Sequence, residues 1–147
     1  MSGEVQSVDT EALESYYEYL AETNPLYRWL DLRLEDVEPG RLSVHLPYDE
    51  KVETPSPPAP PSIHGGVLGT VIDVSAVGAI YTTLDEPRGI VTTDASLSFH
   101  DGVQCDVVAE GTTVDVGSTL GSARVRVTPL DGSDEPVATG SVTCRLL

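Results

Sequence analysis

The spacing of hydrophobic residues changes in kind after residue 83. Residues 62–83 are almost wholly apolar or small, and Asp73 is the single carboxylate among them. A helix that is apolar on every side is normally buried on every side, so this segment predicts a long central helix. Beyond it, apolar and polar residues alternate with a period of two, as in 122–128. This alternation predicts antiparallel strands with one buried and one exposed face.

The alternating part of the chain divides into four segments of strand length, which are 89–99, 104–114, 118–129 and 136–146. The sequence LDGSD at 130–134 combines Gly with Asp and Ser and predicts a hairpin loop between the last two strands.

The part of the chain before the central helix predicts a first helix, capped by Asp9 or Thr10. One face of this helix carries apolar residues at helical spacing, namely Leu13, Tyr16, Tyr17 and Leu20. Asn24-Pro25 should end it and begin a further short helical turn, because proline cannot continue a helix.

Two strands are expected next, at about 31–37 and 41–46, with a turn at Glu38-Pro39-Gly40. The proline-rich residues 47–61 predict a stiff extended loop. The expected fold is therefore α+β, with an antiparallel sheet wrapped around one long helix. We assign residues 1–23 to an N-terminal helical segment and residues 24–147 to a single domain.

The charge of the chain limits its partners. Acidic residues number 24 against 8 basic ones, which gives a net charge of −16, and Lys51 is the only lysine. Such a surface repels the phosphates of nucleic acids and anionic membranes, so we expect neither as a partner. Acid-rich, lysine-poor surfaces are typical of proteins from salt-loaded cytoplasms, where concentrated cations screen the self-repulsion.

Targeting and metal-binding signals are not evident. The N-terminus lacks an apolar signal-peptide region, and the apolar stretch 67–81 is too short for a membrane span, so the cytoplasm is the expected location. Cys105 and Cys144 form no CxxC motif and should be reduced strand residues, and no cofactor or metal is expected.

The start of the central helix and its lone acid are the candidate chemical groups. Gly65 and Gly66 let a ligand approach the backbone, and the unpaired N–H groups of a helix start suit an anion or a developing oxyanion. His64 could donate a further hydrogen bond or orient the loop. Asp73 could serve as a general base toward water or as a nucleophile toward an acyl carbon.

The spacing of these groups predicts an obligate dimer if both act in one site. Eight residues of helix separate Gly65 from Asp73 by ~12 Å, at ~1.5 Å per residue. An aspartate side chain cannot span that distance. Two antiparallel copies of the helix about a two-fold axis would instead place Asp73 of one chain beside Gly65 of the other.

The segment His64 to Asp73, HGGVLGTVID, resembles the HGGxxxxxxD signature of PaaI-type hotdog-fold acyl-CoA thioesterases. The likeness covers roughly residues 25–147 and includes the 24–30 entry, the 38–40 turn and the segment TDASLSF at 93–99. It implies a hotdog fold and hydrolysis of an acyl-CoA thioester by a homodimer at least, with a homotetramer expected.

The resemblance also implies roles for individual residues. The Gly65 amide would polarise the carbonyl, Asp73 of the partner chain would act as base or nucleophile, and His64 would be a loop-orienting donor. Thr92 falls where such enzymes often carry a Ser or Thr that helps to hold the attacking water. Thr54 lies where many relatives have an Asn that binds the thioester.

Coenzyme A is a polyanion, which an acidic protein must attract through local arginines. Arg88, Arg124 and Arg126 are the candidates, with Gly66 beside the thioester. Two alternatives stay open: a hotdog protein that binds acyl-CoA without turnover, and an enoyl-CoA hydratase-type enzyme. The second is less favoured because no histidine follows Asp73 before His100.

Overall fold

The computed structural model describes residues 9–147, so the first eight residues of the predicted N-terminal segment lie outside it. Helix α1 (Thr10–Thr23) is capped by Asp9, whose carboxylate accepts hydrogen bonds from the backbone N–H groups of Glu11 and Ala12. Helix α2 (Pro25–Trp29) follows at once, with Asn24 as its cap. Both predicted N-terminal helices are thereby confirmed.

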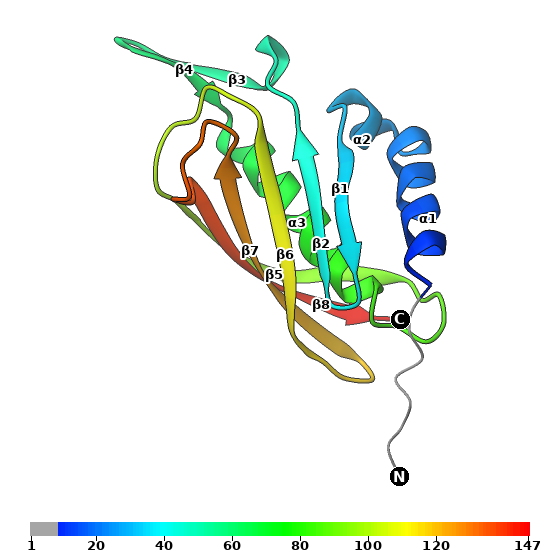
Figure 1. Ribbon diagram of the computed structural model, residues 1–147. Coiled ribbons are helices and arrows are strands. Elements are labelled where there is room, and N and C mark those ends of the chain that lie inside the picture. Colours follow the sequence, from blue (N-terminus) through cyan, green and yellow to red (C-terminus); the bar gives the residue numbers. More distant parts are fainter. Residues whose placement is uncertain (1–8) are drawn as a thin grey trace.

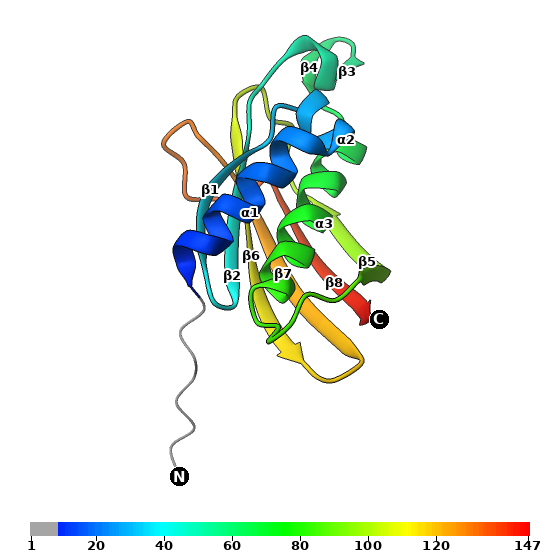
Figure 2. The same cartoon turned by 90° about the vertical axis from the view of Figure 1, so that its right-hand side faces the viewer.

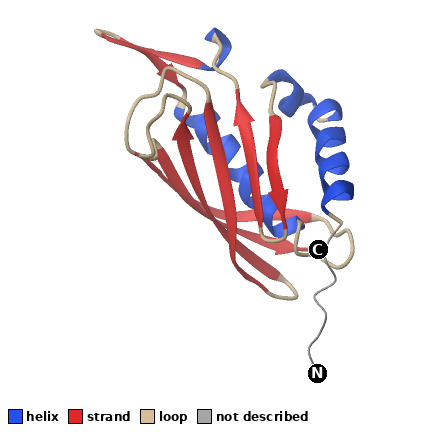
Figure 3. Cartoon of the chain, in the orientation of Figure 1, coloured by secondary structure: helices blue, strands red, loops and turns tan. Residues whose placement is uncertain are grey.

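Six antiparallel strands form one sheet in the order β1-β2-β6-β7-β8-β5, shown in Figure 1 and coloured by element type in Figure 3. Their bounds are β1 Arg33–Glu38, β2 Arg41–Leu46, β5 Ile90–Phe99, β6 Val107–Val116, β7 Leu120–Pro129 and β8 Ala138–Leu146. All six strands were expected from the sequence, and the sheet begins and ends with strands that have one free edge, β1 and β5.

The proline-rich segment differs from the expected loop. It contains a short 3-10 helix (Glu50–Val52) and a small hairpin of β3 (Glu53–Ser56) and β4 (Ala59–Ile63). The prediction of an extended loop is wrong because prolines, which cannot donate to a ladder, are tolerated on strands with free edges. The hairpin projects from the sheet in Figure 1 and leads directly into the central helix.

Helix α3 (Gly65–Tyr81) lies along one face of the six-stranded sheet, and α1 lies on the same side of the sheet (Figure 2). Glycines in the sheet allow this close approach. A Cβ on Gly111 would lie only 2.7 Å from the carbonyl carbon of Ser75, and one on Gly140 would lie 2.7 Å from Ile72 Cγ2. Between α3 and the sheet lies the apolar core, which includes Ile72.

The sequence predicts that α3 is buried on every side, but within a single chain one side of the helix remains partly exposed. Asp73, Val74 and Val77 are only half-buried. The neighbouring strand β5 is largely exposed as well, including Leu97 and Phe99, which are 38% and 50% exposed. An apolar helix side beside an exposed strand edge is a surface that a further polypeptide can cover. None of the helices in residues 9–147 is long and apolar enough to cross a membrane.

Candidate active site

The first turn of α3 is shaped by His64, its N-cap residue. The Nδ1 atom of His64 accepts a hydrogen bond from the Gly66 N–H at 2.9 Å, and the His64 N–H donates to the Val52 carbonyl at 2.7 Å. In a neutral imidazole the second nitrogen, Nε2, then carries the proton. The His64 side chain thus accepts from the first turn of α3, while its backbone N–H donates to the segment before the helix, and its role as a loop-orienting residue stays a prediction.

The Gly65 amide is the free donor at this helix start. The Gly66 N–H is occupied by His64, and Val67 and Leu68 donate to the His64 carbonyl. Among residues 9–147, no acceptor contacts the Gly65 N–H. This amide lies at the positive end of the helix dipole and suits a negatively charged oxygen.

Phe99, at the end of β5, lies beside Gly65. A Cβ at Gly65 would come to 3.7 Å from Phe99 Cζ, which is ordinary contact distance. Gly65 thus lies close to the Phe99 end of β5, so pairing of two β5 strands would determine which residues of a second chain come near Gly65.

Asp73 lies in the middle of α3 and is held by β5. The Thr92 hydroxyl donates a 2.5 Å hydrogen bond to Asp73 Oδ1. Thr92 is paired with Cys144 on the adjacent antiparallel strand β8. Burial raises the pKa of the Cys144 thiol, its hydrogen bond with Thr92 lowers it, and the Asp73 carboxylate raises it. The structure therefore joins the two predicted residues, Asp73 and Thr92, and adds Cys144 as a buried neighbour.

Tyr27 of α2 is a neighbour of this site that sequence reasoning missed. Burial raises the pKa of the Tyr27 phenol, and the nearby Asp73 carboxylate raises it further, followed by Tyr16. No local motif marks Tyr27, because only the folded chain brings it to the same cavity as Val74 of α3. A hydroxyl group next to the carboxylate can donate a hydrogen bond to the anion or to a bound ligand.

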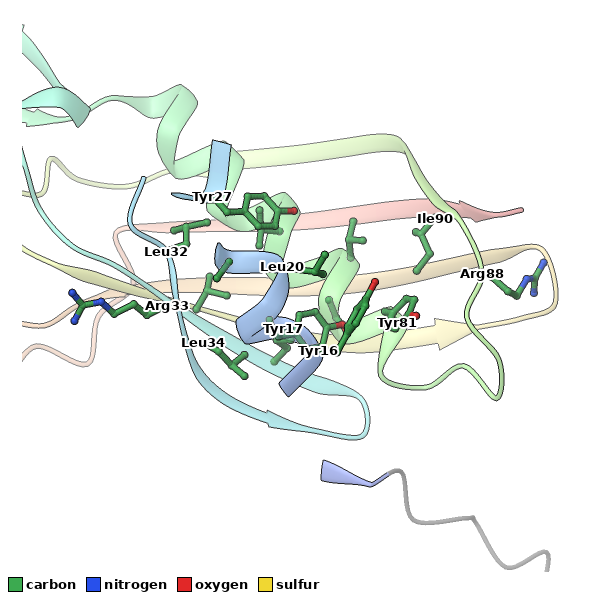
Figure 4. A pocket seen from close by; sticks show the side chains of 16 residues that line it. Tyr16, Tyr17, Leu20, Tyr27, Leu32, Arg33, Leu34, Tyr81, Arg88 and Ile90 are labelled. Atoms are coloured by element: carbon green, nitrogen blue, oxygen red, sulfur yellow. The ribbon is translucent and has the colours of Figure 1, made fainter. Parts of the chain in front are cut away.

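A cavity of about 200 Å³ extends from Tyr27 along α3, between α1, β1 and the start of β5 (Figure 4). We call it the tyrosine cavity because Tyr16, Tyr17, Tyr27 and Tyr81 line it. Val74, directly after Asp73 on α3, is part of its wall. Asp73 itself is not part of the lining, so the cavity lies beside the helix position that carries the carboxylate.

The predicted cationic residues do not gather at this site. Every nitrogen group of the Arg88 guanidinium donates to a backbone carbonyl: Nε to Leu147, Nη1 to Ser118 and Nη2 to Leu146, at 2.7–3.1 Å. Arg88 reaches the cavity lining, but its charge ties the end of β8 to the loop before β5. These hydrogen bonds give Arg88 a structural role, and its contact with coenzyme A stays a prediction.

Arg124 and Arg126 alternate along β7 with buried residues such as Val125. They therefore occupy the face of the sheet opposite α3 and lie away from Asp73 in the same chain. Thr54 lies on β3, paired with Ser62, two residues before His64. It belongs to the entrance of α3 and not to the surroundings of Asp73. No cluster of metal-ligating side chains is found in residues 9–147.

The fold and the site's position on the central helix define a hotdog-type protein, and the comparisons give its family. The sequence model of the thioesterase superfamily matches residues 61–135, and the chain belongs to this superfamily. The matched region runs from the approach to α3 through β7 and includes both Asp73 and Thr92.

Individual proteins similar to this chain agree with the assignment to the thioesterase superfamily. A protein of Halobacterium salinarum, provisionally named an esterase, is 34% identical over 127 residues, which is 82% of this chain and 83% of that protein. A thioesterase family protein from Silicibacter pomeroyi has a similar fold, with a TM-score of 0.80 at 23% identity over 91% of this chain and 96% of that one. The PaaI protein of E. coli, from the phenylacetic acid degradation operon, gives a TM-score of 0.80 at 13% identity over 94% and 95%. Family membership supports thioester hydrolysis as the class of activity.

Proposed function

We propose that this protein hydrolyses acyl-CoA thioesters, with Asp73 as the acid–base or nucleophilic group. The observation that carries the proposal is the half-buried Asp73 carboxylate, fixed by Thr92 at 2.5 Å, with an apolar cavity lined by the next residue of the helix, Val74. A carboxylate with one oxygen anchored and the other available is suited to activate water or to attack a carbonyl carbon.

The second half of the site would come from a partner chain. Gly65 lies beside Phe99 at one end of β5, and Asp73 is bonded to Thr92 near the other end. If two β5 edges pair antiparallel about a two-fold axis near Ala95 or Ser96, the Phe99 end of one chain meets the Thr92 end of the other. Gly65 of one chain would then approach Asp73 of its partner, in agreement with the helix spacing.

The same pairing would cover the exposed features of the isolated chain. Leu97 and Phe99 would be buried, and the open N–H and C=O groups of β5 would find partners. A dimer with two shared sites is the assembly that follows, and a pair of such dimers would give the expected tetramer.

In this site the thioester oxygen would accept a hydrogen bond from the Gly65 amide, and the developing negative charge would lie at the positive end of α3. Acting as base, Asp73 would take a proton from water while the water oxygen bonds to the acyl carbon. The carbon–sulfur bond then breaks, and the proton passes to the departing CoA thiolate. Arg124 and Arg126 of the same chain lie away from this site, on the face of the sheet opposite α3.

The test is a thiol-release assay with a panel of acyl-CoA thioesters in molar KCl, comparing the wild type with Asp73→Asn. We expect turnover by the wild type and a loss of at least about a thousandfold in the variant, with unchanged thermal unfolding. An Asp115→Asn variant, which removes an exposed acid of strand β6 away from the β5 edge, is the control. Binding of acyl-CoA without any turnover would instead support the non-catalytic alternative.

A further inference from the structure

The tyrosine cavity has a lining that contrasts with the rest of the molecule. The chain carries 24 acidic residues, yet none of the 16 side chains that line the cavity is acidic. The walls are mainly aliphatic and tyrosyl, with Val74 and Val77 from α3 and Leu20 from α1. Arg33 and Arg88 complete the lining at its two sides, and their guanidinium groups point away from the cavity in Figure 4. Such a surface favours an apolar ligand, because transfer of apolar groups out of water is favourable and few polar groups lose hydration.

The cavity has a direction defined by α3. At one end lies Tyr27, next to Asp73, and at the other lies Tyr81, with Leu20 between them in Figure 4. Asp73 and Tyr81 are eight residues apart on one helix, which corresponds to ~12 Å. A ligand group that enters beside the carboxylate would therefore extend along the helix toward Tyr81.

The far end is lined by two stacked rings from different helices. The ring centroids of Tyr16 on α1 and Tyr81 on α3 are 5.2 Å apart, with an angle of 13° between the planes. Tyr17 fixes the neighbouring turn, because its hydroxyl donates to the Gly78 carbonyl at 2.8 Å. Helix α1 is thereby anchored to α3, and the stacked pair has a defined position.

We propose that the tyrosine cavity receives the acyl group of the thioester and that the Tyr16–Tyr81 pair sets the longest acyl group it admits. This inference rests on the proposed function, since the acyl carbon must lie at Asp73. An apolar cavity of ~150 Å³ holds one benzene molecule. About 200 Å³ would by proportion hold about eight non-hydrogen atoms, so the substrate class is acyl-CoA with a hexanoyl to octanoyl group or a ring of that size.

The test uses acetyl-, hexanoyl-, octanoyl-, decanoyl- and dodecanoyl-CoA with the wild type, Tyr16→Ala, Tyr81→Ala and Tyr16→Trp. The wild type should show its highest kcat/KM with hexanoyl- or octanoyl-CoA. Each alanine variant should raise the dodecanoyl-to-octanoyl ratio about tenfold or more, as expected when an apolar pocket gains room. Tyr16→Trp should shift the optimum toward shorter chains. Opposite shifts from two changes at one position separate a size limit from general damage.

Tyr19→Ala is the matched control, because Tyr19 belongs to the same helix but is 61% exposed and outside the cavity lining. Its chain-length profile should equal that of the wild type. A wild type that hydrolyses thioesters with a profile that none of the Tyr16 and Tyr81 variants alters would overturn the inference and leave the proposed function intact.

A binding experiment tests the cavity assignment independently of thioester hydrolysis. Calorimetric titration of Asp73→Asn, with and without Tyr16→Ala, measures the affinity for the same acyl-CoA series in molar KCl. A chain-length limit that moves with Tyr16→Ala would support the cavity assignment even if the wild type turned over no thioester. An affinity that does not depend on acyl length would overturn it.

Discussion

The hydroxyl of Thr92 on β5 donates its hydrogen bond to Oδ1 of Asp73 on α3 and thereby links the sheet to the central helix at 2.5 Å. The second carboxylate oxygen, Oδ2, accepts no hydrogen bond from residues 9–147. One oxygen therefore orients the carboxylate while the other is available for chemistry. This division of roles gives Thr92 a positioning function that can be tested.

Replacing Thr92 with valine keeps the shape of the side chain and removes the hydroxyl. We expect kcat for hexanoyl-CoA to fall about tenfold to a hundredfold with a smaller change in KM, because the carboxylate loses its fixed orientation. Thr92→Ser should recover most of the activity. Thr93→Val is the control, since the Thr93 hydroxyl donates to the Thr143 carbonyl and not to Asp73. A Thr92→Val enzyme with wild-type kcat would contradict the positioning role.

Pairing of two β5 edges can be detected by cross-linking. In a Cys105→Ser background, single cysteines at Ala95 and Ser96 would lie next to their own copies across the two-fold axis. Antiparallel neighbours are ~4.5–5.5 Å apart at Cα, within the range of a disulfide. At least one variant should form a covalent dimer on oxidation, seen on a non-reducing gel. Val114→Cys, exposed on β6, should not, and monomers throughout would count against the shared site.

Gly111 should be among the least replaceable glycines. A methyl group there would overlap the Ser75 carbonyl of α3, which is backbone and cannot rotate away. We expect Gly111→Ala to lower the free energy of unfolding by about 3 kcal/mol, at the upper end of overpacking effects. Gly117→Ala is the control, because a Cβ there would meet only ordinary contacts. Urea unfolding in molar KCl measures the stability of both variants. Equal unfolding midpoints for Gly111→Ala and Gly117→Ala would contradict the prediction and show that α3 moves to make room for the methyl group.

Salt should raise activity. At a net charge of −16 the protein repels the phosphates of coenzyme A, and concentrated cations screen that repulsion. We expect kcat/KM to rise with KCl up to molar concentrations, mainly through KM. The measurement is kcat/KM as a function of KCl concentration at constant pH. A value that stays constant or falls with KCl would contradict the prediction.

Local patterns predicted most of the fold, because strand alternation and helix caps depend on neighbouring residues. The β3–β4 hairpin was missed because prolines normally argue against strands. Tyr27 was missed because its proximity to Asp73 exists only in the folded chain. Arg124 and Arg126 were predicted to contact coenzyme A, and their alternation with buried residues of β7 places them on the face opposite α3, away from Asp73 of the same chain. Their contact with the substrate stays a prediction.

The acid-free lining of the tyrosine cavity implies that the two ends of a substrate meet different physical environments. If the substrate is an acyl-CoA, its phosphate end would approach a surface whose repulsion depends on ionic strength, while its acyl end would enter a region where no lining side chain carries negative charge. Recognition of the nucleotide part and selection of the acyl part are then energetically separable. The protein would change its affinity for coenzyme A with the salinity of its surroundings while it keeps the same discrimination between acyl groups.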